Sequence, residues 1–88
     1  MAQIAFKRTT TGGSHLVYWK GKLVMTDPDR HRLLVIDLAT NTMSFVGQVG
    51  NSDSQMNMPV GIAVGANDKL YVMDSGNNRV LVFNDLDP

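Results

Sequence analysis

Two acidic residues are each followed, five positions later, by an arginine. The pairs are Asp27 with Arg32 and Asp74 with Arg79. Such a pair could act as an acid and a base at the rim of a site. Each pair, however, brackets a short polar turn between two apolar runs, where a charge-assisted hydrogen bond between the side chains fixes the turn. We therefore interpret these four residues as structural framework.

The turns enclosed by these pairs, residues 28–31 and 75–78, are the first candidates for a binding site. A long polar connection at residues 47–58 is expected on the same face. Exposed loops on a rigid scaffold often carry recognition, although turns also favour polar residues for purely conformational reasons. The candidate binding residues are Asp29, Arg30, His31, Asp53, Asn77 and Asn78.

Other chemistry-bearing residues give weaker signals. His15 could join a ring of imidazoles in an oligomer, but no acidic residue neighbours it, and we predict that it is packed. Tyr18-Trp19-Lys20 could stack on a base, whereas aromatic residues in strands are usually core. The sequence contains no nucleophile beside a base, no paired carboxylates and no phosphate-binding loop. We predict no catalytic residue, no metal ion and no cofactor.

The amino-acid composition excludes several classes of protein for this chain. The 88 residues include eight Lys and Arg against eight Asp, with no Glu and no Cys, and 43% are apolar. This balance is typical of a globular domain and gives no basis for expecting nucleic-acid binding. Without Cys there is no disulfide and no thiolate-built zinc site. No apolar run reaches the roughly 18 residues that span a bilayer, and the opening is too short for a secretory signal, so we expect a soluble, cytoplasmic protein.

The neutral total conceals opposite charges at the two ends. Residues 1–32 carry six basic and two acidic residues, whereas residues 33–88 carry two basic and six acidic ones. This segregation suits a chain whose front end meets the back end of another copy.

The sequence repeats itself after 47 residues. Residues 22–37 align without a gap on residues 69–84, and the same shift places residues 14–17 on residues 61–64, with His15 on Ile62. Each copy contains three short apolar runs separated by turns rich in Gly, Pro, Asn and Asp, which predicts three strands per copy. The expected strands are residues 16–19, 23–26 and 33–36 in the first copy and residues 61–64, 70–73 and 80–83 in the second.

The third run of each copy is apolar at consecutive positions instead of alternating. Residues 33–36 and 80–83 would therefore present apolar side chains on both faces of a sheet. Such strands need cover above and below, and the connections are too short for helices to provide it. We predict an all-β fold of small antiparallel sheets stacked face to face, as in the blades of a β-propeller.

A fourth strand is expected in each blade. Residues 42–46 follow the third strand of the first copy and alternate larger apolar with smaller residues. The second copy has no equivalent after residue 84, but residues 2–7 have a similar pattern. We predict that they complete the second blade of a neighbouring chain by β-augmentation. The residues of this inter-subunit pairing would be Ile4, Phe6, Val80 and Val82.

The second copy resembles the NHL repeat. Residues 59–64 and 71–80 are close to the family signature Pro-x-Gly-Ile-Ala-Val, a short turn, and Tyr-Val-x-Asp-x-x-Asn-x-Arg-Val. The first copy departs from it at residues 12–15 and at Arg30 but keeps Asp27 and Arg32. The resemblance implies two NHL-type repeats, at about residues 14–47 and 59–84, and a propeller that is most often six-bladed. It implies no single activity.

Two blades alone would leave apolar sheet faces exposed, so we expect the chain to associate. Such arrays need about three or more repeats for stability. Identical chains in head-to-tail contact can close into a ring. Two, three or four copies would give four, six or eight blades, and the usual blade number of the family favours a homotrimer. The predicted function is a self-assembling propeller that acts as a binding scaffold, with itself as the main partner.

Two other functions remain open. One is a hydrolase- or lyase-like propeller enzyme with a site shared between subunits, which a tightly bound metal needed for activity would support. The other is an RNA-binding propeller, which affinity falling steeply with salt would support. The residues that would contact RNA are Lys7, Arg8, Lys20 and Arg30.

Overall fold

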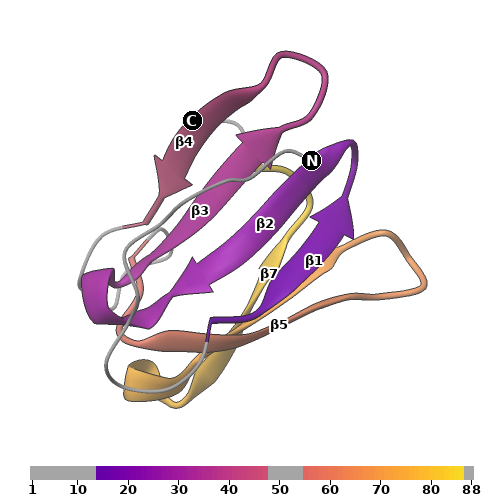
Figure 1. The fold of residues 1–88 in the computed structure, drawn as a ribbon. Coiled ribbons are helices and arrows are strands. Elements are labelled where there is room, and N and C mark those ends of the chain that lie inside the picture. The colour runs from indigo at the N-terminus through magenta and orange to yellow at the C-terminus, as the bar shows by residue number, and fades with distance from the viewer. Residues whose placement is uncertain (1–13, 48–54, 87–88) are drawn as a thin grey trace.

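The structure, a computed structural model, describes residues 14–47 and 55–86. Strands form two antiparallel sheets (Figure 1). Sheet 1 has the strand order β1-β2-β3-β4 and sheet 2 the order β5-β6-β7. The strands are β1 (Leu16–Trp19), β2 (Lys22–Asp27), β3 (Arg32–Asp37), β4 (Thr42–Val46), β5 (Pro59–Val64), β6 (Leu70–Asp74) and β7 (Arg79–Phe83).

These sheets confirm the all-β prediction. Sheet 1 has the four strands expected of a blade, and sheet 2 has three among the described residues. The predicted inter-subunit strand at residues 2–7, with Ile4 and Phe6, lies outside the described residues. The described part of the chain is thus a pair of blade-like sheets.

The strand positions follow the apolar runs. β1 and β4 have the predicted bounds, whereas β2 and β3 each extend one residue further at both ends. The extension arises because the ladder also includes Asp27 with Arg32, directly before and after the turn, and Lys22 with Asp37 at the other end. Asp74 and Arg79 pair in the same way in sheet 2, so both charged pairs close a hairpin.

Each of these hairpins turns through a short 3-10 helix, η1 (Pro28–Arg30) or η2 (Ser75–Asn77). The residues that follow, His31 and Asn78, have positive φ values of 57° and 53°, and their backbone N–H groups donate back into the turn. Asn and His are among the residues that occur most often in this left-handed conformation. Among the described residues, no helix is long and apolar enough to cross a bilayer.

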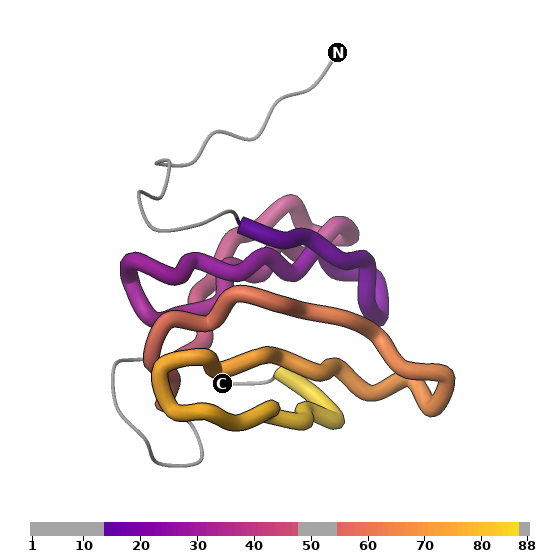
Figure 2. Tube along the Cα trace, turned by 90° about the horizontal axis from the view of Figure 1, so that it is seen from below, coloured from indigo at the N-terminus to yellow at the C-terminus, as the bar shows by residue number. Residues whose placement is uncertain are grey.

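The two sheets stack face to face, and their inner faces form the core (Figure 2). Successive side chains of a strand point to opposite faces, so alternate residues of a strand face the other sheet. Met56, from the connection that precedes β5, is also fully buried there. The core cluster consists of Trp19, Val24, Leu33, Val35, Met56, Leu70, Val72 and Leu86.

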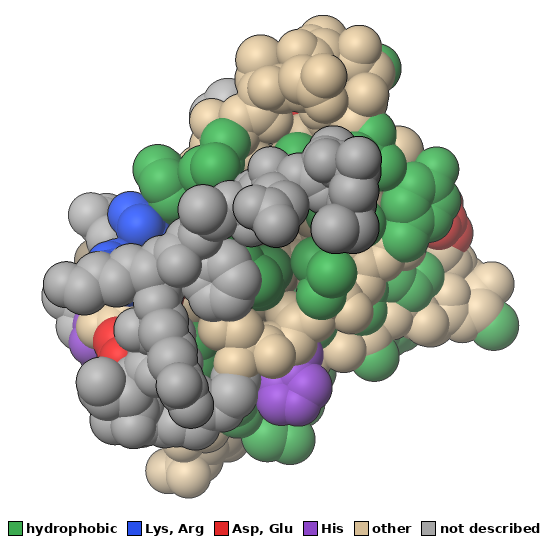
Figure 3. Space-filling view, viewed as in Figure 1, with side chains coloured by type: hydrophobic (Ala, Val, Ile, Leu, Met, Phe, Trp, Pro, Cys, Tyr) green, Lys and Arg blue, Asp and Glu red, His purple; other side chains and the backbone are tan. Residues whose placement is uncertain are grey.

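The outer faces of both sheets are also apolar, as predicted for runs that do not alternate. Met73, Val80 and Val82 on sheet 2 are each more than half exposed. Hydrophobic side chains also gather over the outer face of sheet 1 in Figure 3. The exposed apolar residues of that face are Leu16, Tyr18, Met43 and Phe45.

The first strand of each sheet departs from the 47-residue repeat by one position. Leu16 lies opposite Met25 in sheet 1, and Ile62 lies opposite Val72 in sheet 2. Met25 and Val72 are 47 residues apart, but Leu16 and Ile62 are 46 apart, because the stretch between the paired residues Ile62 and Val72 is one residue longer than that between Leu16 and Met25. The gapless alignment is therefore wrong for this strand.

This shift changes the interpretation of His15. With this shift, the residue of sheet 2 that corresponds to His15 is Gly61 instead of Ile62. The repeat therefore gives no reason to expect a buried side chain at position 15. His15 precedes β1, and its side chain is exposed, which makes the prediction of a packed His15 wrong.

Candidate functional site

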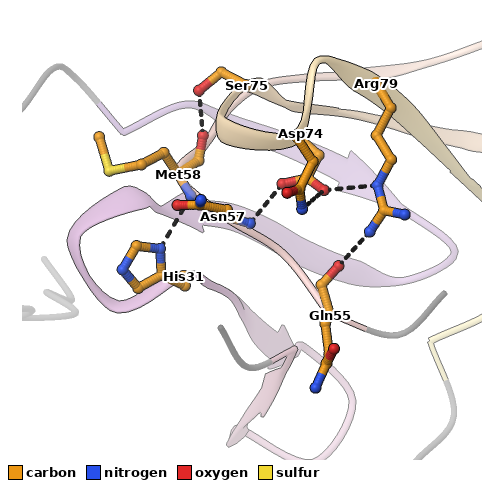
Figure 4. Close-up of polar contacts among 8 residues, drawn as sticks. His31, Gln55, Asn57, Met58, Asp74, Ser75 and Arg79 are labelled. Atoms are coloured by element: carbon orange, nitrogen blue, oxygen red, sulfur yellow. Dashed lines mark hydrogen bonds and ion pairs between the residues drawn. The ribbon is translucent and has the colours of Figure 1, made fainter. Parts of the chain in front are cut away.

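Polar contacts concentrate where the β6–β7 hairpin meets the segment that leads into β5 (Figure 4). Asp74, the last residue of β6, is fully buried. Its carboxylate accepts hydrogen bonds from the backbone N–H of Asn57 at 2.6 Å, from Asn77 Nδ2 at 2.8 Å and from Arg79 Nε at 2.8 Å. Donors from the incoming segment, the turn and the next strand thus converge on one buried group.

Arg79 extends this network to the backbone before β5. Because Asp74 and Arg79 face each other in the ladder, the guanidinium lies beside the carboxylate. Its Nη2 atom donates to the backbone carbonyl of Gln55 at 2.8 Å. A guanidinium has five N–H donors in a fixed plane, so one side chain can serve two acceptors in different directions.

The pKa of Asp74 is lowered. Burial alone would raise it, because burial disfavours the charged carboxylate. The hydrogen bonds from Asn57, Asn77 and Arg79, together with the charge of Arg79, outweigh burial and hold the pKa below its ordinary value. At neutral pH the carboxylate is charged and only accepts hydrogen bonds, so its role is to hold the three donor segments in place.

The turn itself adds a second set of contacts. Ser75 Oγ donates to the carbonyl of Met58 at 2.6 Å. The backbone N–H of Gly76 donates to the carbonyl of Asn57 at 2.7 Å. A Cβ at Gly76 would lie only 2.7 Å from that same oxygen, so glycine is needed for the close approach.

The hairpin of sheet 1 contacts this segment from the other side. The backbone N–H of Met58 donates to His31 Nδ1 at 3.0 Å. Residues 57 and 58 therefore touch both hairpin turns, which places the two turns at the same end of the molecule (Figure 1). Residues 57 and 58, at the end of the polar connection, thus form the joint between the two sheets.

Asp27 is the sheet 1 counterpart of Asp74 and has weaker contacts. Arg32 Nε lies 3.1 Å and Arg30 Nη1 3.3 Å from its two carboxylate oxygens. Its side chain is 11% exposed, whereas that of Asp74 is 0% exposed. The guanidinium of Arg32 also lies 3.7 Å from the ring centre of Phe45, a cation–π contact. The ion pairs expected across the two hairpins are thus present.

Three further hydrogen bonds join a side chain of the first repeat to a backbone carbonyl of the second. Sequence reasoning missed them, because every residue has a carbonyl and a carbonyl acceptor therefore leaves no signal in residue types. They run from Thr26 Oγ1 to Val60 at 3.1 Å, from Trp19 Nε1 to Asp68 at 2.9 Å and from Lys20 Nζ to Asn84 at 2.6 Å.

Five of the six predicted binding residues lie at the two hairpin turns, and Asp53 lies outside the described residues. Arg30, His31 and Asn77 make the intramolecular contacts described above. Asn78 is exposed, while the other four are of intermediate burial. The five residues at the turns are Asp29, Arg30, His31, Asn77 and Asn78.

The aromatic and basic residues of β1 do not form one stacking surface. Trp19 is 2% exposed and belongs to the core, whereas Tyr18 is 65% exposed on the outer face. Lys20 Nζ lies 5.0 Å from the centre of the Trp19 ring. The interpretation of strand aromatics as core is confirmed for Trp19 and is wrong for Tyr18.

The arrangement at the turns anchors backbone segments. Within residues 14–47 and 55–86, no group of three or more acidic or histidine side chains is placed to hold a metal ion. In the same ranges, every buried side-chain nitrogen or oxygen has a hydrogen-bond partner. A fully satisfied polar network of this kind fixes geometry.

Comparison with known families agrees with this architecture. Residues 56–83 match the family model of the NHL repeat. The match spans the segment from Met56 through sheet 2, so the buried carboxylate and its partners lie almost entirely within it. No curated protein matches the sequence.

Proposed function

We propose that this chain, which carries an NHL repeat at residues 56–83, assembles head-to-tail with copies of itself into a closed β-propeller ring that serves as a binding scaffold. The observation that carries the proposal is a correspondence between faces: each outer face is built like an inner face that is already packed within the chain. A head-to-tail contact joins two different surfaces of each copy and closes when the rotation per copy divides a full turn.

The outer face of sheet 2 has the pattern of the inner face of sheet 1. By ladder position, the correspondences are Val24 with Tyr71, Thr26 with Met73, Leu33 with Val80 and Val35 with Val82. The four residues of sheet 1 are at most 4% exposed. Met73, Val80 and Val82 are more than half exposed, so sheet 2 presents outward the kind of surface on which a further sheet packs.

The outer face of sheet 1 corresponds in the same way to the inner face of sheet 2. The correspondences are Leu16 with Ile62, Tyr18 with Val64, Leu23 with Leu70, Met25 with Val72, Leu34 with Leu81 and Ile36 with Phe83. All these residues are apolar, and Leu70 and Val72 are fully buried against sheet 1. The two outer faces are therefore the two halves of one type of contact.

At one pair of corresponding positions the two sheets have residues of very different size. Gly65 stands at the ladder position that Trp19 occupies in sheet 1. The Tyr71 ring lies over Gly65, where a Cβ would be 2.6 Å from the ring carbon Cε2. An aromatic ring thus occupies the corresponding region of both sheets, and aromatic residues are enriched at protein interfaces.

The edge of β7 supports the predicted strand exchange. The corresponding edge of β3 pairs with β4, but among the described residues no strand pairs with that edge of β7. A strand containing Ile4 and Phe6 from a neighbouring copy would complete sheet 2 by β-augmentation beside Val80 and Val82. Covering this edge would also remove a site of uncontrolled strand pairing.

The proposed ring contains three copies of the chain and binds a partner on one face. Three copies would give the six blades that are usual for propellers of the family that this sequence resembles. Both hairpin turns lie at one end of the sheets, so one face of the ring would present polar turn residues of every blade. Loops held by a rigid scaffold are common recognition sites, so we propose binding rather than catalysis on this face.

Sedimentation velocity over a micromolar dilution series tests the assembly. We expect a species with three times the mass of one chain. Val80→Asp places a charge in the apolar contact and should give single chains. The matched control, Leu38→Asp, changes an exposed apolar residue in the turn between β3 and β4 and should assemble normally. A folded single chain at these concentrations, or normal assembly of Val80→Asp, would contradict the proposal.

A further inference from the structure

The outer face of sheet 2 contains an open pocket at the β6–β7 hairpin. Its volume is about 520 Å³. The lining combines apolar side chains of the two strands with polar residues of the turn. The lining residues are Met73, Ser75, Asn78, Arg79 and Val80.

The same position in sheet 1 is covered by another part of the chain. The residues 47 positions before the pocket lining are Thr26, Pro28, His31, Arg32 and Leu33. Thr26 donates to the carbonyl of Val60, and His31 accepts the N–H of Met58. Met56 is buried in the same cluster as Leu33. Residues 56–60, which end the connection and begin β5, therefore pack on this part of sheet 1.

We infer that the pocket receives residues 11–14 of a second copy of the chain. These residues precede β1 as residues 56–59 precede the stretch of β5 that pairs from Ile62 onward. The offset is 45 residues instead of 46, because the β5–β6 ladder shifts register by one residue between Pro59 and Ile62. The inference rests on the proposed head-to-tail assembly and names the contact by which the front end of one copy engages the back of the next.

The chemistry of the pocket fits such a segment. Asn78 replaces His31 and has the same left-handed backbone conformation. Its side-chain oxygen is an acceptor at a position equivalent to His31 Nδ1, so it can accept a backbone N–H of the incoming segment. Met73 replaces Thr26, so at that point the contact is apolar.

One position of the incoming segment is smaller than its counterpart. By the same offset, Thr11 takes the place of Met56, whose side chain is fully buried against sheet 1. A methionine at position 11 should therefore fill the pocket better than the native threonine. Burying that much additional apolar surface should strengthen association by at least about tenfold.

Cross-linking identifies the contact. The chain has no cysteine, so Asn78→Cys with Gly13→Cys introduces a defined pair, equivalent to His31 and Met58. A short bis-maleimide should join these cysteines between copies and give covalent dimers and trimers. The internal control, His31→Cys with Met58→Cys, should give a cross-link within one chain.

A second experiment does not depend on reagent geometry. Thr11→Met should lower the dissociation constant of the assembly by at least about tenfold, whereas the matched variant Thr10→Met should leave it within about threefold of the native value. If the wild-type chain forms a ring but the Asn78→Cys/Gly13→Cys variant is not cross-linked between copies, or Thr11→Met associates no more tightly than Thr10→Met, the inference is overturned and the proposed assembly stays intact. A wild-type chain that sediments as a monomer would overturn both.

Discussion

Replacing Asp74 by alanine is expected to destabilise the chain far more than replacing its counterpart Asp27. Asp74→Ala removes the acceptor of three donors in a fully buried position. Asp27→Ala removes two longer contacts from a side chain that is partly exposed. The two positions are equivalent in the repeat, so each variant serves as the control for the other.

The magnitudes follow from burial. Arg79 is 29% exposed and keeps contact with water after the substitution. The Asn57 N–H and the Asn77 amide, however, lose their acceptor at a buried position, and each buried donor left unsatisfied costs about 1–3 kcal/mol. Asp27 accepts two longer contacts from side chains that are 28% and 33% exposed, and such pairs contribute about 1 kcal/mol or less. A chain of this length is expected to have a total stability of about 4–13 kcal/mol, so Asp74→Ala should remove a large share of it.

Urea denaturation followed by circular dichroism measures both losses. Protein concentration has to be held constant, because association stabilises the folded chain by mass action. Equal losses at the two positions, or a loss at Asp74 of less than about 1 kcal/mol, would refute the reasoning that burial and the number of donors decide the cost.

The pH dependence provides a separate test through Asp74→Asn. The pKa of Asp74 is lower in the folded chain than its ordinary value of 3.8, so the ionised carboxylate contributes stability above that value and loses it as pH falls through the folded pKa. The difference in unfolding free energy between wild type and Asp74→Asn should therefore be full at neutral pH and shrink below about pH 4. A difference that stays constant into acid would contradict the assignment.

Two further predictions concern the joint between the sheets and the assembly. His31→Ala should cost about 1–3 kcal/mol in urea denaturation, because it leaves the N–H of Met58 without its acceptor and places alanine at a positive φ. His31→Asn should stay within about 0.5 kcal/mol of wild type, since asparagine tolerates that conformation and supplies an acceptor, and equal losses would count against the role of His31. Deletion of residues 1–8 should abolish the ring in sedimentation velocity, because it uncovers the edge of β7 in every copy, and a truncated chain that still sediments as a trimer would contradict the exchange.

The sheets could be predicted from sequence because the pattern of apolar runs and polar turns occurs twice in the chain. Apolar runs fixed the place of each strand, and the acidic–basic pairs marked the ends of the central hairpins. The offset of the first strand was missed, because a short apolar run fits its partner almost equally well when moved by one residue. Only the ladders, with Leu16 opposite Met25 and Ile62 opposite Val72, reveal the longer turn in the second repeat.

The contacts of the candidate site were only partly accessible from sequence. The pairing of Asp74 with Arg79 follows from their spacing. The N–H of Asn57 as a donor to Asp74, and the ring of His31 as an acceptor for Met58, depend on where the connection between the sheets returns to the hairpins. Residue types identify side chains that can bond, but backbone partners are supplied by tertiary structure.

The exchange of Thr26 for Met73 makes the joint within a chain and the proposed joint between chains respond differently to temperature. Within the chain, Thr26 donates a hydrogen bond to the carbonyl of Val60 across the joint. Between chains, the methionine at the equivalent position contributes only apolar contact. Hydrophobic stabilisation weakens on cooling. In a ring of these chains, cooling should therefore weaken the boundaries between subunits more than the joint within each pair of sheets.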